Sequence, residues 1–126
     1  MKILRLVLIK EIFDLLASGV KEEAYREIKP YWIKRLIRNK GKMSPQKWNE
    51  LYEVLKNPPN NYDTLEDILK SFNCEFIKYD TIEFVNGYIH QDSKIVKKHL
   101  GTEISLGNYL WGAPEGICFI LKIGDI

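Results

Sequence analysis

The sequence predicts an α+β fold: a small curved sheet or partly open β-barrel of about five strands, with one helix after the first strand and a helical insertion after the second. Three observations predict it. Residues 2–9 are rich in Ile, Leu and Val, apolar residues recur at helical spacing within residues 30–72, and β-branched and aromatic residues dominate after residue 73. The 126 residues, 45% hydrophobic and 29% charged, fit one folded domain with one core.

The first three elements are expected within residues 2–28. Residues 2–9 have the length and composition of a buried strand, and residues 10–18 carry a helical stripe of apolar side chains. Gly19 follows the last helical turn, and glycine readily adopts the left-handed conformation that caps helix carbonyls. Residues 20–28 are therefore expected to leave the helix and run extended.

Three helices are expected in the insertion. Residues 30–37 begin with proline, which suits the first helical position, and carry four apolar residues at helical spacing. Ser44 is expected to cap a second helix, which ends at the Asn-Pro-Pro-Asn-Asn segment 57–61. Asp63 and Glu66 have the spacing of a capping box and predict a short third helix.

Three more strands are expected in residues 81–88, 94–106 and 117–123, which are separated by glycines. Asn86 and Gly87 form a dipeptide that is typical of a tight hairpin turn. A contact between Asn86 and a nucleic-acid base is the alternative interpretation.

Charge and cysteine content limit the function classes. The net charge of +2 alone does not indicate a nucleic-acid-binding protein, but residues 29–42 hold six lysines and arginines and no acid, which predicts a positive face. Cys74 and Cys118 lack zinc-site spacing, so reduced thiols in a cytoplasmic protein are expected. His90 and His99 lack partners at metal or triad spacing and are expected at the surface. No metal, cofactor or membrane span is predicted.

Several separated motifs agree in order: Gly-Val-Lys at residues 19–21, REIKPYW at 26–32, FVNGY at 84–88, and WGAP followed by CFI within 111–120. Together they resemble the ASCH domain, a branch of the PUA-like β-barrel superfamily, in a form common among phage and gut-bacterial proteins. The resemblance implies a single domain over residues 1–126 with a helical insertion at about 30–72. Residues 38–73 are the part that it covers least.

The signature of that family reads Gly-x-Lys-x-x-Glu-x-Arg, with threonine replacing the glutamate in members that resemble an N4-acetylcytidine amidohydrolase. Gly19, Lys21 and Arg26 match it, whereas Ala24 stands at the glutamate or threonine position. The resemblance implies a cleft for RNA or modified nucleosides, where Lys21 and Arg26 face a phosphate or base. The methyl group of Ala24 supplies neither nucleophile nor acid, so the threonine-based hydrolysis of those members is not expected here. Lys21 is a catalytic candidate only if the protein is an enzyme.

RNA or nucleotide binding is the function expected first. Aromatic and basic residues interleave on the helix that starts at Pro30, which offers stacking for unpaired bases and charge for the backbone. The candidate binding residues are Lys21, Arg26, Lys29, Tyr31, Lys34, Arg35, Arg38, Asn86 and Trp111.

Other interpretations remain open for these residues. Lys21 and Arg26 could pair with neighbouring acids, the basic helix face could be solvated, and the Trp111 indole could plug a barrel end instead of stacking on a ligand. Two other functions stay open: a hydrolase acting on a modified nucleoside or RNA, and a protein-interaction module of phage origin that uses the surface around Trp48 and Tyr52.

Overall fold

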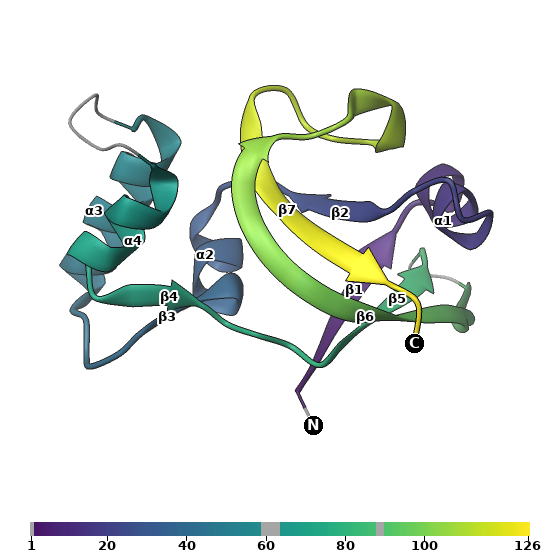
Figure 1. Ribbon diagram of the computed structural model, residues 1–126, viewed down its shortest axis with the longest axis horizontal. Coiled ribbons are helices and arrows are strands. Elements are labelled where there is room, and N and C mark those ends of the chain that lie inside the picture. The colour runs from purple at the N-terminus through teal and green to yellow at the C-terminus, as the bar shows by residue number, and fades with distance from the viewer. Residues whose placement is uncertain (1, 59–63, 88–89) are drawn as a thin grey trace. The chain divides into compact units, whose positions relative to one another are not determined.

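A computed structural model describes residues 2–58, 64–87 and 90–126 (Figure 1). The chain divides into two compact units. The sheet unit comprises Met1–Arg26 and Lys78–Ile126, and the helical unit comprises Glu27–Ile77. The helical unit contains the segment predicted as an insertion.

The described residues of the sheet unit form one five-stranded mixed sheet of order β1-β5-β6-β7-β2. Strand β1 runs parallel to β5, and the remaining neighbours are antiparallel. The elements of the unit are β1 (Ile3–Leu8), α1 (Lys10–Ala17), β2 (Glu23–Arg26), β5 (Thr81–Asn86), β6 (His90–Leu106), the short 3-10 helix η1 (Tyr109–Trp111) and β7 (Ile117–Gly124). In Figure 1, β6 curves strongly alongside β7.

Alternation along the strands places one set of side chains in the core. Leu4, Leu6 and Leu8 of β1 are buried, whereas Ile3 and Arg5 are exposed. Strands β5 and β7 add fully buried aromatic rings, and α1 adds two apolar side chains from its buried face. These core residues are Phe84, Phe119, Phe13 and Leu16.

The predicted α+β class is confirmed, as are the first strand, the first helix and the extended segment after Gly19. Gly19 has φ +82°, the left-handed conformation expected of it. Strands β1 and β2 lie at opposite ends of the strand order and no ladder joins them among the described residues. The sheet is therefore not closed, and the barrel detail of the prediction is not confirmed.

The described residues of the helical unit form three helices and a two-stranded sheet. Its elements are α2 (Pro30–Leu36), β3 (Ile37–Asn39), α3 (Pro45–Lys56), α4 (Leu65–Ser71) and β4 (Cys74–Phe76). Ser44 caps α3 as expected, because its side chain accepts the backbone N–H of Lys47 at 3.2 Å. The prediction that Asp63 and Glu66 form a capping box is wrong, since Thr64 and Asp67 form it; Asp63 lies outside the described residues.

The pair of strands β3 and β4 was not predicted. Helical spacing assigned Ile37 to the preceding helix, but Ile37 begins β3 and pairs with Phe76 across an antiparallel ladder. The partners lie far apart in the sequence, so a local pattern does not reveal the pairing.

Cys74 and Cys118 are free, buried thiols, and burial raises the pKa of both.

The surface position expected for His99 is wrong: its side chain is only 4% exposed. Nδ1 accepts the backbone N–H of Tyr79 at 3.1 Å, so the neutral ring carries its proton on Nε2, 2.9 Å from Thr102 Oγ1. Both ring nitrogens therefore have partners within the protein. The side chain of His90 lies outside the described residues.

Acidification is expected to destabilise the fold through His99. Burial lowers the pKa of His99 below its usual 6.5, so the unfolded chain takes up a proton at this position more readily than the folded chain. The free energy of unfolding should then fall as the pH drops below about 6.5. Urea unfolding of the wild type and His99→Gln at several pH values measures this, and equal pH slopes for the two proteins would contradict it.

Candidate functional site

Lys21 lies in the segment between α1 and β2, where the sequence signature placed it. Its side chain is 4% exposed, and Nζ donates a 2.6 Å hydrogen bond to the backbone carbonyl of Trp111. The same ammonium lies 4.5 Å from the ring centroid of Tyr25. Lys21 is thus a buried cation whose contacts are a carbonyl dipole and an aromatic face.

The electrostatic surroundings of Lys21 are unfavourable for its charge. Burial first, and then the nearby charge of Arg26, lower its pKa to about 8, while Glu23 acts in the opposite direction. Lys21 forms no ion pair within the described part of the chain. Glu23 instead accepts a hydrogen bond from Tyr25 and pairs with Lys122 at 3.1 Å.

Tyr25 connects this site to the loop between β6 and β7. Its hydroxyl donates to Glu23 and accepts the backbone N–H of Asn108, each at 3.1 Å. Burial raises the Tyr25 pKa to about 12, so the phenol stays protonated at neutral pH. Gly107 is required beside it, because a Cβ there would lie 2.7 Å from the Tyr25 ring.

Trp111 ends the short helix η1 and is partly buried. Its side chain packs, together with Ala113, against a cluster of three buried residues: Tyr25, Cys118 and Ile120. Its backbone carbonyl accepts the hydrogen bond from Lys21 Nζ. Trp111 therefore contributes apolar packing through its side chain and a hydrogen-bond acceptor through its backbone.

Arg26 lies at the end of β2 and donates to two backbone carbonyls. Nη1 bonds the carbonyl of Tyr25 at 2.7 Å, and Nη2 bonds that of Val7 at 2.9 Å. Val7 belongs to β1, so this guanidinium links the two edge strands that no ladder joins. Ala24, two residues earlier on the strand, is fully buried.

A pocket of about 180 Å³ adjoins Lys21. It is lined by Gly19, Lys21, Glu22, Lys97, Ile123, Gly124 and Asp125. Lys97 pairs with Asp125 at 2.8 Å within this group. Arg26 does not line this pocket, so the two signature cations are electrostatically coupled but contact different groups.

The remaining candidates fall on both units. In the helical unit, Tyr31 is 60% exposed and its hydroxyl accepts Arg35 Nη1 at 3.0 Å, while the Arg35 guanidinium lies 5.4 Å from the Tyr31 ring centroid and 5.6 Å from that of Trp32. Lys34 is also exposed on α2. In the sheet unit, Asn86 is the half-buried last residue of β5.

Two of the predicted binding residues are engaged by acids. Lys29 pairs with Glu27 at 3.2 Å, and Arg38 pairs with Glu75, with Nε donating at 2.7 Å. All four side chains are substantially exposed, so these pairs leave the cations accessible to solvent.

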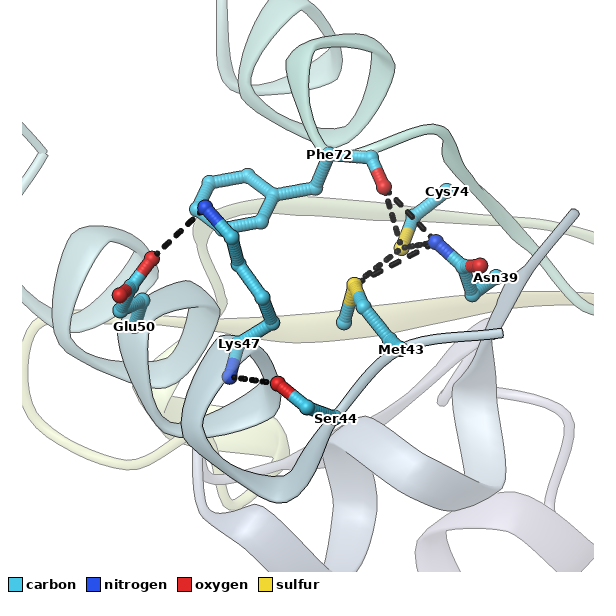
Figure 2. A network of polar contacts seen from close by, with 7 residues as sticks. All are labelled: Asn39, Met43, Ser44, Lys47, Glu50, Phe72 and Cys74. Carbon is cyan, nitrogen blue, oxygen red and sulfur yellow. Dashed lines mark hydrogen bonds and ion pairs between the residues drawn. The ribbon is translucent and has the colours of Figure 1, made fainter. Parts of the chain in front are cut away.

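A second pocket, of about 660 Å³, lies in the helical unit and was not predicted. It is lined by Asn39, Gly41, Lys42, Met43, Ser44, Lys47, Ser71, Phe72 and Asn73. Figure 2 shows the polar contacts around it, which join the end of β3, the start of α3 and the turn between α4 and β4. The basic run and the capping serine were visible in the sequence, but their proximity to Phe72 and Asn73 depends on the packing of α4.

No family model, curated protein or solved structure matches this chain, so the ASCH resemblance stays a prediction. None of the described helices is long and apolar enough to span a membrane. The described residues contain no cluster of three or more His, Cys, Asp or Glu side chains that could hold a metal ion.

Proposed function

We propose that this protein binds RNA or a nucleotide through the sheet unit, and that this unit is the partly open PUA-like barrel of an ASCH domain. The observation that carries the proposal is the state of Lys21, a buried ammonium held near a second cation without an ion pair among the described residues. We place this activity in the cytoplasm, since both cysteines are free thiols.

An anion would relieve the electrostatic cost at Lys21. Burial and the repulsion from Arg26 both disfavour the charged form, and a phosphate in the adjoining pocket would offset both. A strongly perturbed pKa beside a pocket is typical of functional sites. The volume of about 180 Å³ suits one phosphate group with part of a nucleoside, while the rest of the ligand extends over the surface.

The helical unit adds a surface suited to unpaired bases. Tyr31 is exposed, and Arg35 stacks beside it and Trp32. An aromatic ring with an adjacent guanidinium stacks on any base, whatever its sequence. This surface favours single-stranded RNA over a duplex, whose bases are already stacked.

Binding of a fluorescently labelled single-stranded RNA is expected to weaken as the pH rises through about 8, where Lys21 loses its proton. It should also weaken with added salt, because phosphate contacts release counterions. Lys21→Gln should abolish the pH step and reduce affinity about tenfold, in line with the loss of one charged hydrogen bond. Fluorescence anisotropy at several pH values measures both effects.

The matched control is Lys98→Gln, which removes an equal charge from an exposed position on β6. It should leave the pH step intact. The proposal is wrong if the wild type shows no RNA association at low salt, or if a folded Lys21→Gln protein keeps the affinity and pH profile of the wild type.

The pKa of Lys21 also favours a second candidate, a hydrolase acting on a modified nucleoside. An amine with a pKa of about 8 is suited to proton transfer near neutral pH. Ala24 supplies no nucleophile and is fully buried, so water would have to attack the amide. Cytidine released from N4-acetylcytidine by the wild type but not by Lys21→Ala would favour this candidate over binding alone.

A further inference from the structure

The walls of the pocket in the helical unit are fixed by hydrogen bonds. The Asn39 side chain donates to the carbonyl of Phe72 at 2.8 Å (Figure 2). It also donates to the carbonyl of Asn73 at 3.2 Å and accepts the backbone N–H of Gly41 at 2.9 Å. The Lys40 backbone N–H adds a bond to the Asn73 carbonyl at 2.9 Å. The pocket is therefore preformed, as ligand sites usually are, and its volume of about 660 Å³ lies within the usual range.

The lining of this pocket is positive. Of the nine described residues that line it, two are lysines and none is acidic. The helical unit as a whole holds nine lysines and arginines against seven acids, whereas the sheet unit holds ten of each. The net positive charge of the chain thus belongs to the unit that contains the pocket.

Hydrogen-bond donors in the pocket are available to a ligand. Lys42 forms no hydrogen bond or ion pair within the described ranges of the chain. Lys47 Nζ forms an ion pair with Glu50 at 3.1 Å, and Glu50 does not line the pocket. An ammonium carries three N–H donors, so this pair leaves donors available. The Ser44 oxygen accepts the Lys47 backbone N–H, which leaves its own hydroxyl proton to donate.

One wall of the pocket is aromatic. The Phe72 ring is half-buried, and Lys47 Nζ lies 5.9 Å from its centroid, so the ring and the ammonium occupy the same side (Figure 2). A ligand that carries both a negative group and a flat apolar part would use both surfaces. Inorganic phosphate would contact only the ammonium and not the Phe72 ring.

We propose that this pocket binds the phosphate group of a nucleotide, free or within an RNA strand, with Lys42, Lys47 and the Ser44 hydroxyl as donors and Phe72 against the nucleoside. This site is separate from Lys21. It rests on the proposed function in one respect only, the choice of a nucleotide as the class of ligand. It gives the helical unit a binding role of its own.

Calorimetric titration of the full chain with AMP, adenosine and inorganic phosphate tests the proposal. AMP is expected to bind more tightly than either of the other two. The double variant Lys42→Gln/Lys47→Gln should weaken AMP binding at least about tenfold, since each lysine supplies a charged hydrogen bond. The matched control Lys56→Gln/Lys70→Gln removes the same charge from exposed positions on α3 and α4 outside the pocket, and should bind AMP like the wild type.

The assignment is overturned if AMP does not bind, if adenosine or inorganic phosphate binds as tightly as AMP, or if the pocket variant keeps wild-type affinity. AMP binding that Lys21→Gln abolishes and the pocket variant preserves would also overturn it. Competition by single-stranded RNA would identify a strand as the source of the phosphate, and its failure to compete would identify a free nucleotide.

The two proposals can fail separately. RNA binding that depends on Lys21, together with no AMP binding, would contradict only the proposed nucleotide site in the helical unit. AMP binding that depends on Lys42 and Lys47, together with no RNA association, would contradict only the proposed RNA site in the sheet unit.

Discussion

Replacing Phe119 with alanine is expected to lower the free energy of unfolding by about 3–5 kcal/mol, the usual cost of removing a buried phenyl ring. Phe119 is 0% exposed and lies on β7, which pairs with both β6 and β2. In register it lies opposite Ile104 and Arg26. Loss of the ring would leave a cavity among three strands, and the surrounding backbone is too constrained by ladder hydrogen bonds to close it.

Urea unfolding followed by circular dichroism measures this loss. Tyr109→Ala is a suitable control, because Tyr109 is an aromatic residue of the same unit that is 79% exposed. That variant should change the stability by no more than about 0.5 kcal/mol. A loss below about 1 kcal/mol for Phe119→Ala would show that the core beside β7 is looser than the burial of the ring indicates.

Arg26→Ala is expected to cost about 1.5–3 kcal/mol, the range for hydrogen bonds made by a charged group. The guanidinium donates to the carbonyls of Tyr25 and Val7 and so links β2 to β1. Arg26→Lys should restore little of the stability, because one ammonium does not reproduce the planar fork that reaches two carbonyls. Thermal unfolding and RNA binding should be measured on the same samples.

This pair of measurements separates the two interpretations of Arg26. A lower melting temperature, with RNA affinity kept under conditions where the variant is folded, indicates a structural role. Unchanged stability with weaker RNA binding would contradict the expected cost and indicate a ligand contact instead. Lys98→Ala, an exposed cation on β6, controls for the loss of one positive charge.

The elements that the sequence predicted correctly are those that local patterns specify. The apolar stretch of β1, the helical stripe of α1 and the caps at Gly19 and Ser44 each act within a few residues. The strand pair β3 and β4 was missed because the partners of Ile37 and Asn39 lie more than thirty residues away. Three-residue strands carry too little periodicity to be recognised alone.

The environment of the candidate residues depends on distant contacts in the same way. His99 was expected at the surface, but Tyr79, twenty residues away, supplies its buried hydrogen bond. Lys21 was singled out by its motif, yet its burial depends on Trp111. The pocket in the helical unit combines two separate stretches of sequence, 39–47 and 71–73, so neither stretch alone could have indicated its shape.

The division of the sheet unit into two chain segments affects how the protein folds during synthesis. Among the described strands, β2 pairs with β7, which follows it in the sequence only after the whole helical unit, β5 and β6. The helical unit is continuous in the sequence, so it can form while the ribosome is still translating. The edge of β2 therefore stays without this partner strand until β7 has been translated, and chaperone protection would matter most during that interval.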